Sequence, residues 1–318
     1  MTKTSINSFK KNIKGLWNHE PYVKKYKKAK YTNKSLEQDH MVNRLKTVNK
    51  ILKQNLNKNS NILELGFGAG QSASLFLKEG FKYTGVDISE SLVKFAESKN
   101  KKFIKNKLAS FYVGSMDKKL KFKNKQFDAV IIIGALQYVM NLNGLMREIK
   151  RVLKKDGIFI LAITNSFNIT DIVSPRKFLK FLARVIYKEH FMYSYSTTFK
   201  SILTETTNLK KQFKITGNEK WLNKNFFTKG NYLPWSFKGK RRILAYDRIR
   251  NLISKYKFQI IYYDYGGVFF YRKTKNKIIN LVFDLSNYLL NLLYKIFIFN
   301  FLLKRIGSSN IFLLKDKS

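Results

Sequence analysis

Three glycines at alternate positions constrain the fold of this chain more than any other feature. Gly66, Gly68 and Gly70 follow the apolar run 61–65 and lead directly into a helical pattern. A strand–glycine–helix turn of this kind lets a ligand approach bare backbone. The next apolar run ends on Asp87, 21 residues after Gly66, close to the roughly 20 residues that separate a glycine turn from a ribose-binding carboxylate. The pattern predicts a site for a flat organic ligand, with an ordinary strand-to-helix turn as the alternative.

Strand-like and helix-like segments alternate along much of the chain. Apolar runs predict strands, and apolar residues at helical spacing predict helices. Such alternation with short links is typical of an α/β fold with a doubly wound, mostly parallel sheet. We therefore expect a seven-stranded, Rossmann-like sheet with strands at 61–65, 82–87, 110–114, 127–133, 158–163, 258–263 and 310–314, helices at about 35–52, 70–79, 90–100 and 143–154, helix caps at Ser35 and Ser89, and a turn at 155–157.

Three acidic residues fall where predicted strands end. Glu64 lies near the end of the first strand, Asp87 closes the second, and Asp117 follows the third. In an open parallel sheet, ligands bind at the carboxyl ends of the strands where the strand order reverses. A buried carboxylate without a partner is costly, so three acids at one edge favour a polar ligand. For any one of them, a helix cap or a loop residue is the alternative.

The sequence divides into four parts. Residues 1–57 predict an N-terminal helical or lid segment, and residues 58–164 predict the ligand-binding core. Residues 165–256 are basic and aromatic and break the alternation, which predicts a mostly helical insertion or cap. Residues 257–318 carry the last two strands with an apolar helix, 278–306, between them.

The apolar helix has three interpretations. Residues 285–303 contain one charged residue and are near the length that crosses a bilayer. A spanning helix would place Asn287, Asn291, Lys295 and Asn300 in lipid, which is unfavourable. Because these four recur near one helical stripe, we expect an amphipathic helix that packs on the core or lies on a membrane surface, with a buried helix between the last two strands as the alternative.

Composition excludes several chemistries. The chain has no cysteine, which removes disulfides, thiolate zinc sites, cysteine nucleophiles and cysteine-bound iron–sulfur clusters. Its three histidines, His19, His40 and His190, lie far apart and predict no metal site. The N-terminus lacks an apolar signal core, which predicts a cytoplasmic protein.

The net charge of +42 falls mostly outside the predicted core. Residues 60–171 carry +8, and the remainder carries +34. Such an excess favours an anionic partner, either a phospholipid surface or nucleic acid, although A/T-rich codons would enrich lysine without any functional cause. Only 11 of the 62 basic residues are arginine, whereas nucleic-acid readers favour arginine. The sequence therefore favours a membrane surface over nucleic acid as the partner. It predicts a cytoplasmic protein that can also lie peripherally on the inner face of a membrane.

Five motifs in this order resemble the class I S-adenosylmethionine-dependent methyltransferases, especially the group that acts on small molecules, quinones and sugars. They cover roughly a third of the chain and comprise residues 62–70 (ILELGFGAG), 85–89 (GVDIS), 114–117 (GSMD), 127–130 (FDAV) and 145–157 (LMREIKRVLKKDG). The resemblance implies a Rossmann-like methyltransferase fold with S-adenosylmethionine as the cofactor. It says little about the acceptor.

The resemblance also assigns roles to residues. Glu64 and the glycine turn, with Phe67, would line the methionine part of the cofactor, and Asp87 would accept hydrogen bonds from both ribose hydroxyls. Ile88 and Met116 would contact the adenine, and Asp117 would accept from its amino group. Residues that would approach the sulfonium are Ile133, Gly134 and Leu136. The candidate bases are His190, for which a packing role is the alternative, and Tyr138, which stands where the family often has a histidine.

These expectations lead to one main function and three alternatives. The main one is methyl transfer to a small molecule, a sugar or a lipid-linked intermediate. The alternatives are an RNA methyltransferase, a dinucleotide oxidoreductase, which the glycine spacing disfavours, and a non-catalytic module that binds the cofactor. The sequence lacks the Asp/Asn-Pro-Pro-Tyr/Phe motif that the resemblance would require for methylation of amino groups on DNA bases.

Overall fold

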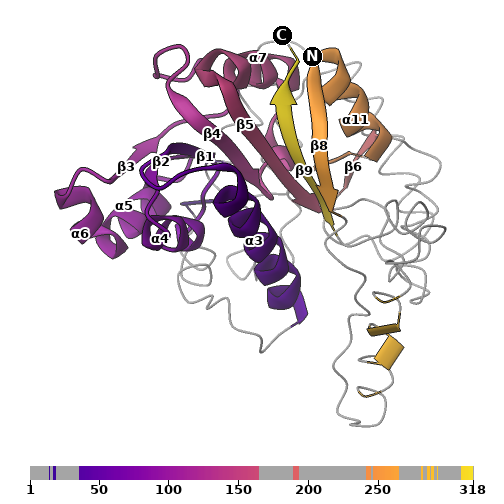
Figure 1. Ribbon diagram of the computed structural model, residues 1–318, viewed down its shortest axis with the longest axis horizontal. Helices are drawn as coiled ribbons and strands as arrows, with labels where there is room; N and C mark the ends of the chain where they lie inside the picture. The colour runs from indigo at the N-terminus through magenta and orange to yellow at the C-terminus, as the bar shows by residue number, and fades with distance from the viewer. Residues whose placement is uncertain are drawn as a thin grey trace, which may run out of the picture.

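A single seven-stranded sheet organises the described part of the chain (Figure 1). The computed structural model describes residues 36–164, 189–192, 241–244, 246–264 and 309–317, together with isolated residues at 14, 17–18, 281, 285–286, 288–289 and 292. The strand order is β3-β2-β1-β4-β5-β9-β8, which confirms the predicted mostly parallel, doubly wound sheet. The strands are β1 (Asn61–Leu65), β2 (Lys82–Asp87), β3 (Ala109–Val113), β4 (Phe127–Ile133), β5 (Leu153–Thr164), β8 (Phe258–Asp264) and β9 (Ser309–Asp316).

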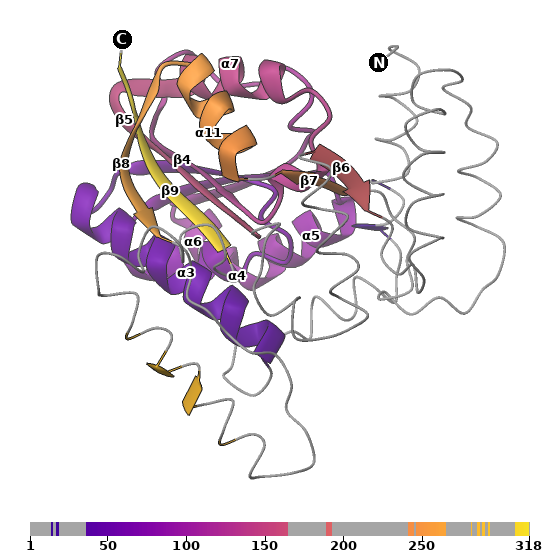
Figure 2. The same cartoon turned by 90° about the vertical axis from the view of Figure 1, so that its right-hand side faces the viewer.

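Helices cover both faces of the sheet, as Figure 2 shows. One face packs on α3 (Leu36–Asn55), α4 (Gln71–Lys78) and α5 (Glu90–Lys99), which is followed by α6 (Lys101–Lys105). The other face packs on α7 (Leu142–Val152) and α11 (Tyr246–Lys255). Successive strand residues point to opposite faces, so both layers bury apolar side chains. The continuous apolar sequence of β4 follows from this double cover.

The C-terminal strand lies inside the sheet. β9 pairs antiparallel with β5 on one side and with β8 on the other. Its residues from Ser309 to Leu314 are all buried. A strand covered on both faces and paired on both edges is rich in apolar residues, as positions 311–314 are. The sequence had predicted a strand at 310–314.

The junction between α7 and β5 differs from the prediction. The helix ends at Val152, and β5 begins at the next residue. The pairing jumps from Phe127–Leu153 to Ala129–Ile158. The predicted turn at 155–157 is therefore wrong: these residues form an irregular part of β5, where the extra residues are accommodated between two stretches of regular pairing.

The range predicted as an insertion contributes three described elements. β6 (Glu189–Met192) and β7 (Arg241–Leu244) form a separate antiparallel pair, and α11 buries Ile249 and Ile253 in the core of the main sheet. The rest of 165–256, most of the predicted helix 278–306 and the predicted cap Ser35 lie outside the described residues. Within the described part, no helix has the length and apolar character needed to cross a bilayer.

Candidate functional site

The glycine turn lies at the carboxyl end of β1, between β2 and β4. The strand order reverses at this point, which is where ligands bind in open α/β sheets. Gly66, Gly68 and Gly70 all have positive φ, at 79°, 61° and 74°, a region that residues with a Cβ rarely adopt. A Cβ on Gly66 would collide with Ala135, and one on Gly70 would lie 2.9 Å from the Cβ of Ala96 on α5. The glycines therefore shape a backbone cradle and let α5 approach it.

Asp87 faces this cradle from the end of β2. Its Oδ2 accepts a hydrogen bond from the Gly68 amide at 2.9 Å, and its Oδ1 accepts from the Ser89 amide at 2.9 Å. Burial raises the pKa of Asp87 to about 6, although backbone hydrogen bonds from Ser89, Gly68 and Ile88 oppose the rise. A carboxylate has about four lone-pair sites, so Asp87 can accept from a ligand hydroxyl in addition to these backbone amides. The adjacent Ile88 is half-buried.

Glu64 is held by side chains of the protein. Its Oε2 accepts hydrogen bonds from the Ser72 hydroxyl at 2.6 Å and the Tyr83 hydroxyl at 2.8 Å. Burial is the main cause that raises its pKa to about 7. This carboxyl group joins β1 to the first turn of α4 and to β2. In the structure, Glu64 thus holds β1, α4 and β2 together. Its contact with a cofactor remains a prediction.

The loop after β3 is tied to the loop after β4 by Asp117. Its Oδ1 accepts hydrogen bonds from the Met140 amide at 2.9 Å and the Asn141 amide at 2.7 Å. The Met116 methyl group lies 3.4 Å from the position of a Cβ on Gly66. Met116 is therefore beside the cradle, on its β3 side, and Asp117 faces the loop after β4.

The remaining residues predicted to line the site differ in exposure. Ile133, Gly134 and Tyr138 are half-buried near the end of β4, whereas Leu136 is buried in the core. Phe67 is also a core residue, and its ring fills the space that a side chain on Gly85 would need. Only the backbone of Phe67 is thus available to a ligand.

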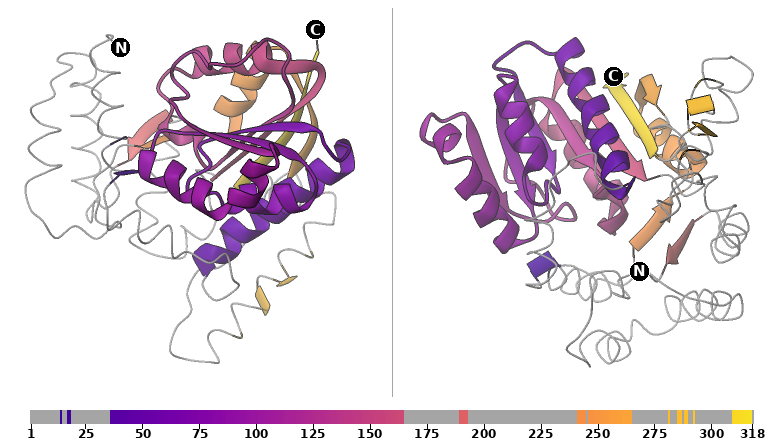
Figure 3. Two further views of the ribbon diagram at one scale, coloured as in Figure 1. Left: turned by 90° about the vertical axis from the view of Figure 1, so that its left-hand side faces the viewer. Right: turned by 90° about the horizontal axis from the view of Figure 1, so that it is seen from below.

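The two candidate bases lie on neighbouring elements. Tyr138 belongs to η1 (Leu136–Tyr138), and β7 lies against η1. His190 is on β6, where it pairs with Ile243 of β7. Figure 3 shows this small sheet at one end of the main sheet. The fold therefore brings His190 and Tyr138 to the same region, although the structure describes only the backbone of His190.

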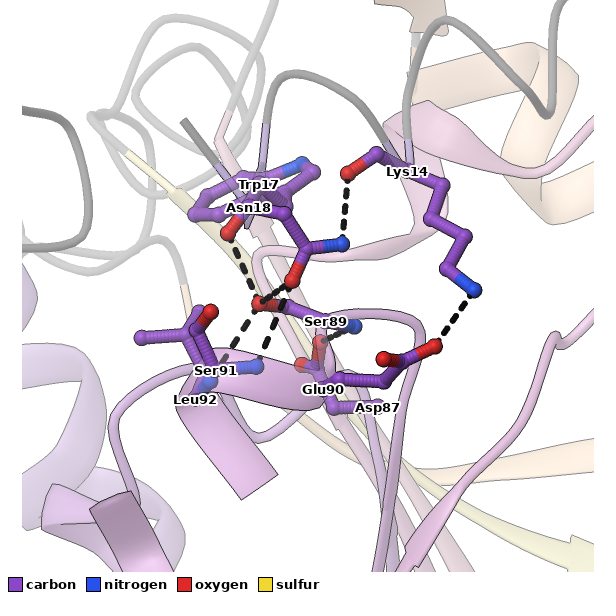
Figure 4. Close-up of polar contacts among 8 residues, drawn as sticks. All are labelled: Lys14, Trp17, Asn18, Asp87, Ser89, Glu90, Ser91 and Leu92. Atoms are coloured by element: carbon purple, nitrogen blue, oxygen red, sulfur yellow. Dashed lines mark hydrogen bonds and ion pairs between the residues drawn. The ribbon is translucent and has the colours of Figure 1, made fainter. Parts of the chain in front are cut away.

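N-terminal residues reach the site in a way that the sequence did not predict. The Trp17 ring meets the Tyr138 ring edge-to-face, with centroids 5.5 Å apart, and the Trp17 carbonyl accepts a hydrogen bond from the Ser89 hydroxyl at 2.7 Å. Asn18 also contacts Ser89 (Figure 4). The sequence signal that could have identified Trp17 is a large apolar side chain within a polar, lysine-rich segment.

Arg44 is a second residue that sequence reasoning missed. It lies on α3, is 5% exposed, and donates from Nε to the Ser309 hydroxyl and from Nη2 to the Thr164 hydroxyl, each at 3.2 Å. Its Nη1 lies 3.0 Å from the position of a Cβ on Gly134. It thus braces the ends of β4, β5 and β9. Across the described residues, no group of three histidine, aspartate or glutamate side chains is placed to hold a metal ion.

Comparison with known proteins identifies the central part of the chain. Residues 63–161 match a family model described as a methyltransferase domain. The uncharacterized protein MJ1252 of Methanocaldococcus jannaschii is 34% identical over 124 residues, which cover 39% of this chain and 44% of that protein.

Two further relatives have named activities. Demethylmenaquinone methyltransferase of Leptospira interrogans is 32% identical over 111 residues, covering 34% of this chain and 45% of its own length. Ubiquinone biosynthesis O-methyltransferase of Pelagibacter ubique is 30% identical over 108 residues, covering 34% and 43%. The chain spans less than half the length of these relatives.

Proposed function

Because the chain carries a class I S-adenosylmethionine-dependent methyltransferase domain, we propose that the protein transfers a methyl group from S-adenosylmethionine to a small-molecule acceptor. The observation that carries the proposal is the position of Asp87, whose carboxylate faces the glycine turn and retains capacity to accept from a ligand hydroxyl. The cradle fits the cofactor because the three glycines leave the backbone of the turn bare beside the carboxylate of Asp87.

The cofactor, when bound, supplies an electrophilic sulfonium methyl. The chain's own residues then have three tasks: to bind, to align and to exclude water. Asp87 would hold the ribose, Met116 would cover one face of the adenine, and the backbone of the glycine turn would lie along the methionine part. A base is needed only if the acceptor must lose a proton. Tyr138 and His190 are the residues that we propose for that role.

The relatives support a small-molecule acceptor. Two of them are named for demethylmenaquinone and for ubiquinone biosynthesis. The finer form of the proposal is a lipid-linked acceptor met at an anionic membrane surface. Five large apolar residues between 281 and 292 support it: they are helical, 44–68% exposed, and spaced along one helical face, namely Leu281, Leu285, Tyr288, Leu289 and Leu292. The +34 charge outside residues 60–171 would attract anionic headgroups.

Vesicle flotation tests the membrane part alone. The full chain should float with phosphatidylglycerol vesicles and much less with phosphatidylcholine vesicles, because both charge and apolar burial contribute. The double variant Leu285→Glu with Leu289→Glu should stay at the bottom of the gradient. Equal flotation of this variant would reject the apolar stripe as the contact.

Methyl transfer itself needs a labelled cofactor. The full chain is incubated with methyl-labelled S-adenosylmethionine and extract, and the products are separated into lipids, RNA and soluble metabolites. Label in the lipid or the metabolite fraction that disappears with Asp87→Ala supports the proposal. Label only in RNA would favour the RNA methyltransferase, and ligand binding without label in any fraction would favour a non-catalytic module.

A further inference from the structure

Trp17 touches the residues that follow three adjacent strands. Sheet order places β1 between β2 and β4. The Trp17 carbonyl contacts Ser89, which follows β2, and its ring contacts Tyr138, which follows β4. Trp17 also packs against the small cluster formed by Ala69, in the glycine turn after β1, and Leu92 of α5. A residue with these three contacts must cross the carboxyl end of β1, above the glycine turn.

Polar contacts fix this part of the N-terminal segment on the first turn of α5 (Figure 4). Asn18 Oδ1 lies 3.0 Å from the Ser89 hydroxyl and accepts from the Ser91 amide at 3.3 Å. Asn18 Nδ2 donates to the Lys14 carbonyl at 2.9 Å. Lys14 forms an ion pair with Glu90 at 2.6 Å. The position of Trp17 therefore rests on contacts of its neighbours with three consecutive residues, the cap of α5 and the first two residues of that helix.

Ser89 links this contact to the ribose-binding acid. Its amide donates to Asp87 Oδ1, and its hydroxyl caps α5 by accepting from the Leu92 amide at 3.2 Å. The single proton of the same hydroxyl is shared between the Trp17 carbonyl and Asn18 Oδ1. Ser89 is completely buried. One residue thus orients both Asp87 and the backbone of Trp17.

We propose that Trp17 is a cofactor-binding residue that closes the site over the glycine turn and, with Tyr138, excludes water from the reacting sulfonium. The inference rests on the proposed function, because it concerns the same cofactor site. The aromatic pair supplies a large apolar area at the edge of the site, beside its backbone and carboxylate groups. A purely packing role for Trp17 would leave cofactor affinity unchanged.

Binding of S-adenosylhomocysteine to three variants separates the two roles. Trp17→Ala should weaken binding by about tenfold, because truncation of a buried aromatic contact is costly, and Trp17→Phe should retain most of the affinity. Phe103→Ala is the matched control, since Phe103 is a partly buried aromatic residue on α6, which leads into the opposite end of β3. Phe103→Ala should lower thermal stability without changing affinity. Equal affinity of wild type and Trp17→Ala would overturn the inference.

A second measurement leaves Trp17 unchanged and uses its fluorescence as the probe. The chain has three tryptophans, Trp17, Trp221 and Trp235. In the double variant Trp221→Phe with Trp235→Phe, saturating S-adenosylhomocysteine should change the emission of Trp17 and reduce its quenching by acrylamide. An unchanged signal, with binding verified by calorimetry, would overturn the inference. Absence of binding to the wild-type chain would instead overturn the proposed function, so the two failures are distinguishable.

Discussion

Replacing Glu64 by glutamine should make the stability of the protein less sensitive to pH. The carboxyl group is buried, with the Ser72 and Tyr83 hydroxyls as hydrogen-bond donors. Burial raises its pKa from the ordinary 4.5 to about 7. Between these values the folded state binds more protons than the unfolded state, so stability falls as pH rises. The difference corresponds to a loss of about 3 kcal/mol once the pH exceeds 7.

Glutamine resembles the protonated acid and does not titrate. Its carbonyl oxygen can accept from both hydroxyls, so we expect Glu64→Gln to match the wild type at pH 5 and to exceed its free energy of unfolding by up to about 3 kcal/mol at pH 8. Urea unfolding at several pH values measures this difference. Asp87 titrates in both proteins, so its own contribution largely cancels.

Glu79→Gln is the matched control. Hydrogen bonds from Asn49 and Lys53 lower the pKa of Glu79, so its ionised form stabilises the fold above the ordinary pKa and the control should lose stability at pH 8. The reasoning about Glu64 fails if the difference between Glu64→Gln and the wild type is the same at pH 5 and pH 8.

Three further predictions concern the site and its supports. S-adenosylhomocysteine should bind more tightly as pH rises through about 6 and release a proton, because the ligand favours ionised Asp87; Asp87→Asn should bind weakly at every pH, and calorimetry in buffers of different ionisation enthalpy would reveal a missing proton release. Gly66→Ala should cost about 1–3 kcal/mol of stability through its φ of 79° and the contact with Ala135, and a thermal melt matching the wild type would contradict this. Arg44→Met should cost about 1–3 kcal/mol because it removes the Arg44 donor to the buried Ser309 hydroxyl, whereas Lys46→Met on the exposed face of α3 should be nearly neutral in urea unfolding.

Local sequence patterns were sufficient for the sheet and the cradle. β4 is apolar throughout because helices cover both faces, and the glycines mark positive φ where no other residue fits well. Asp87 was identified by its spacing from Gly66, and it does face the glycine turn. In these elements, the residue types required by the backbone are visible within a short window.

Contacts between distant segments could not be read in this way. Trp17 meets Tyr138 and Ser89, far along the chain, and Arg44 reaches Ser309 from the other end. Neither contact leaves a periodic signal in the sequence. The turn expected at 155–157 is wrong because a Lys-Asp-Gly sequence suits a tight turn, whereas β5 pairs with β4 on both sides of it, at Leu153 and from Ile158 onward.

The central claim is that the carboxylate of Asp87 and the glycine turn together hold S-adenosylmethionine. Calorimetric titration of the full chain with S-adenosylhomocysteine, compared with Asp87→Ala, tests it most directly. We expect saturable one-to-one binding by the wild type and a loss of about 10- to 100-fold in the variant, since hydrogen bonds to a charged group contribute about 1.5–3 kcal/mol each. No heat of binding at millimolar ligand, or the same affinity in both proteins, would contradict the account.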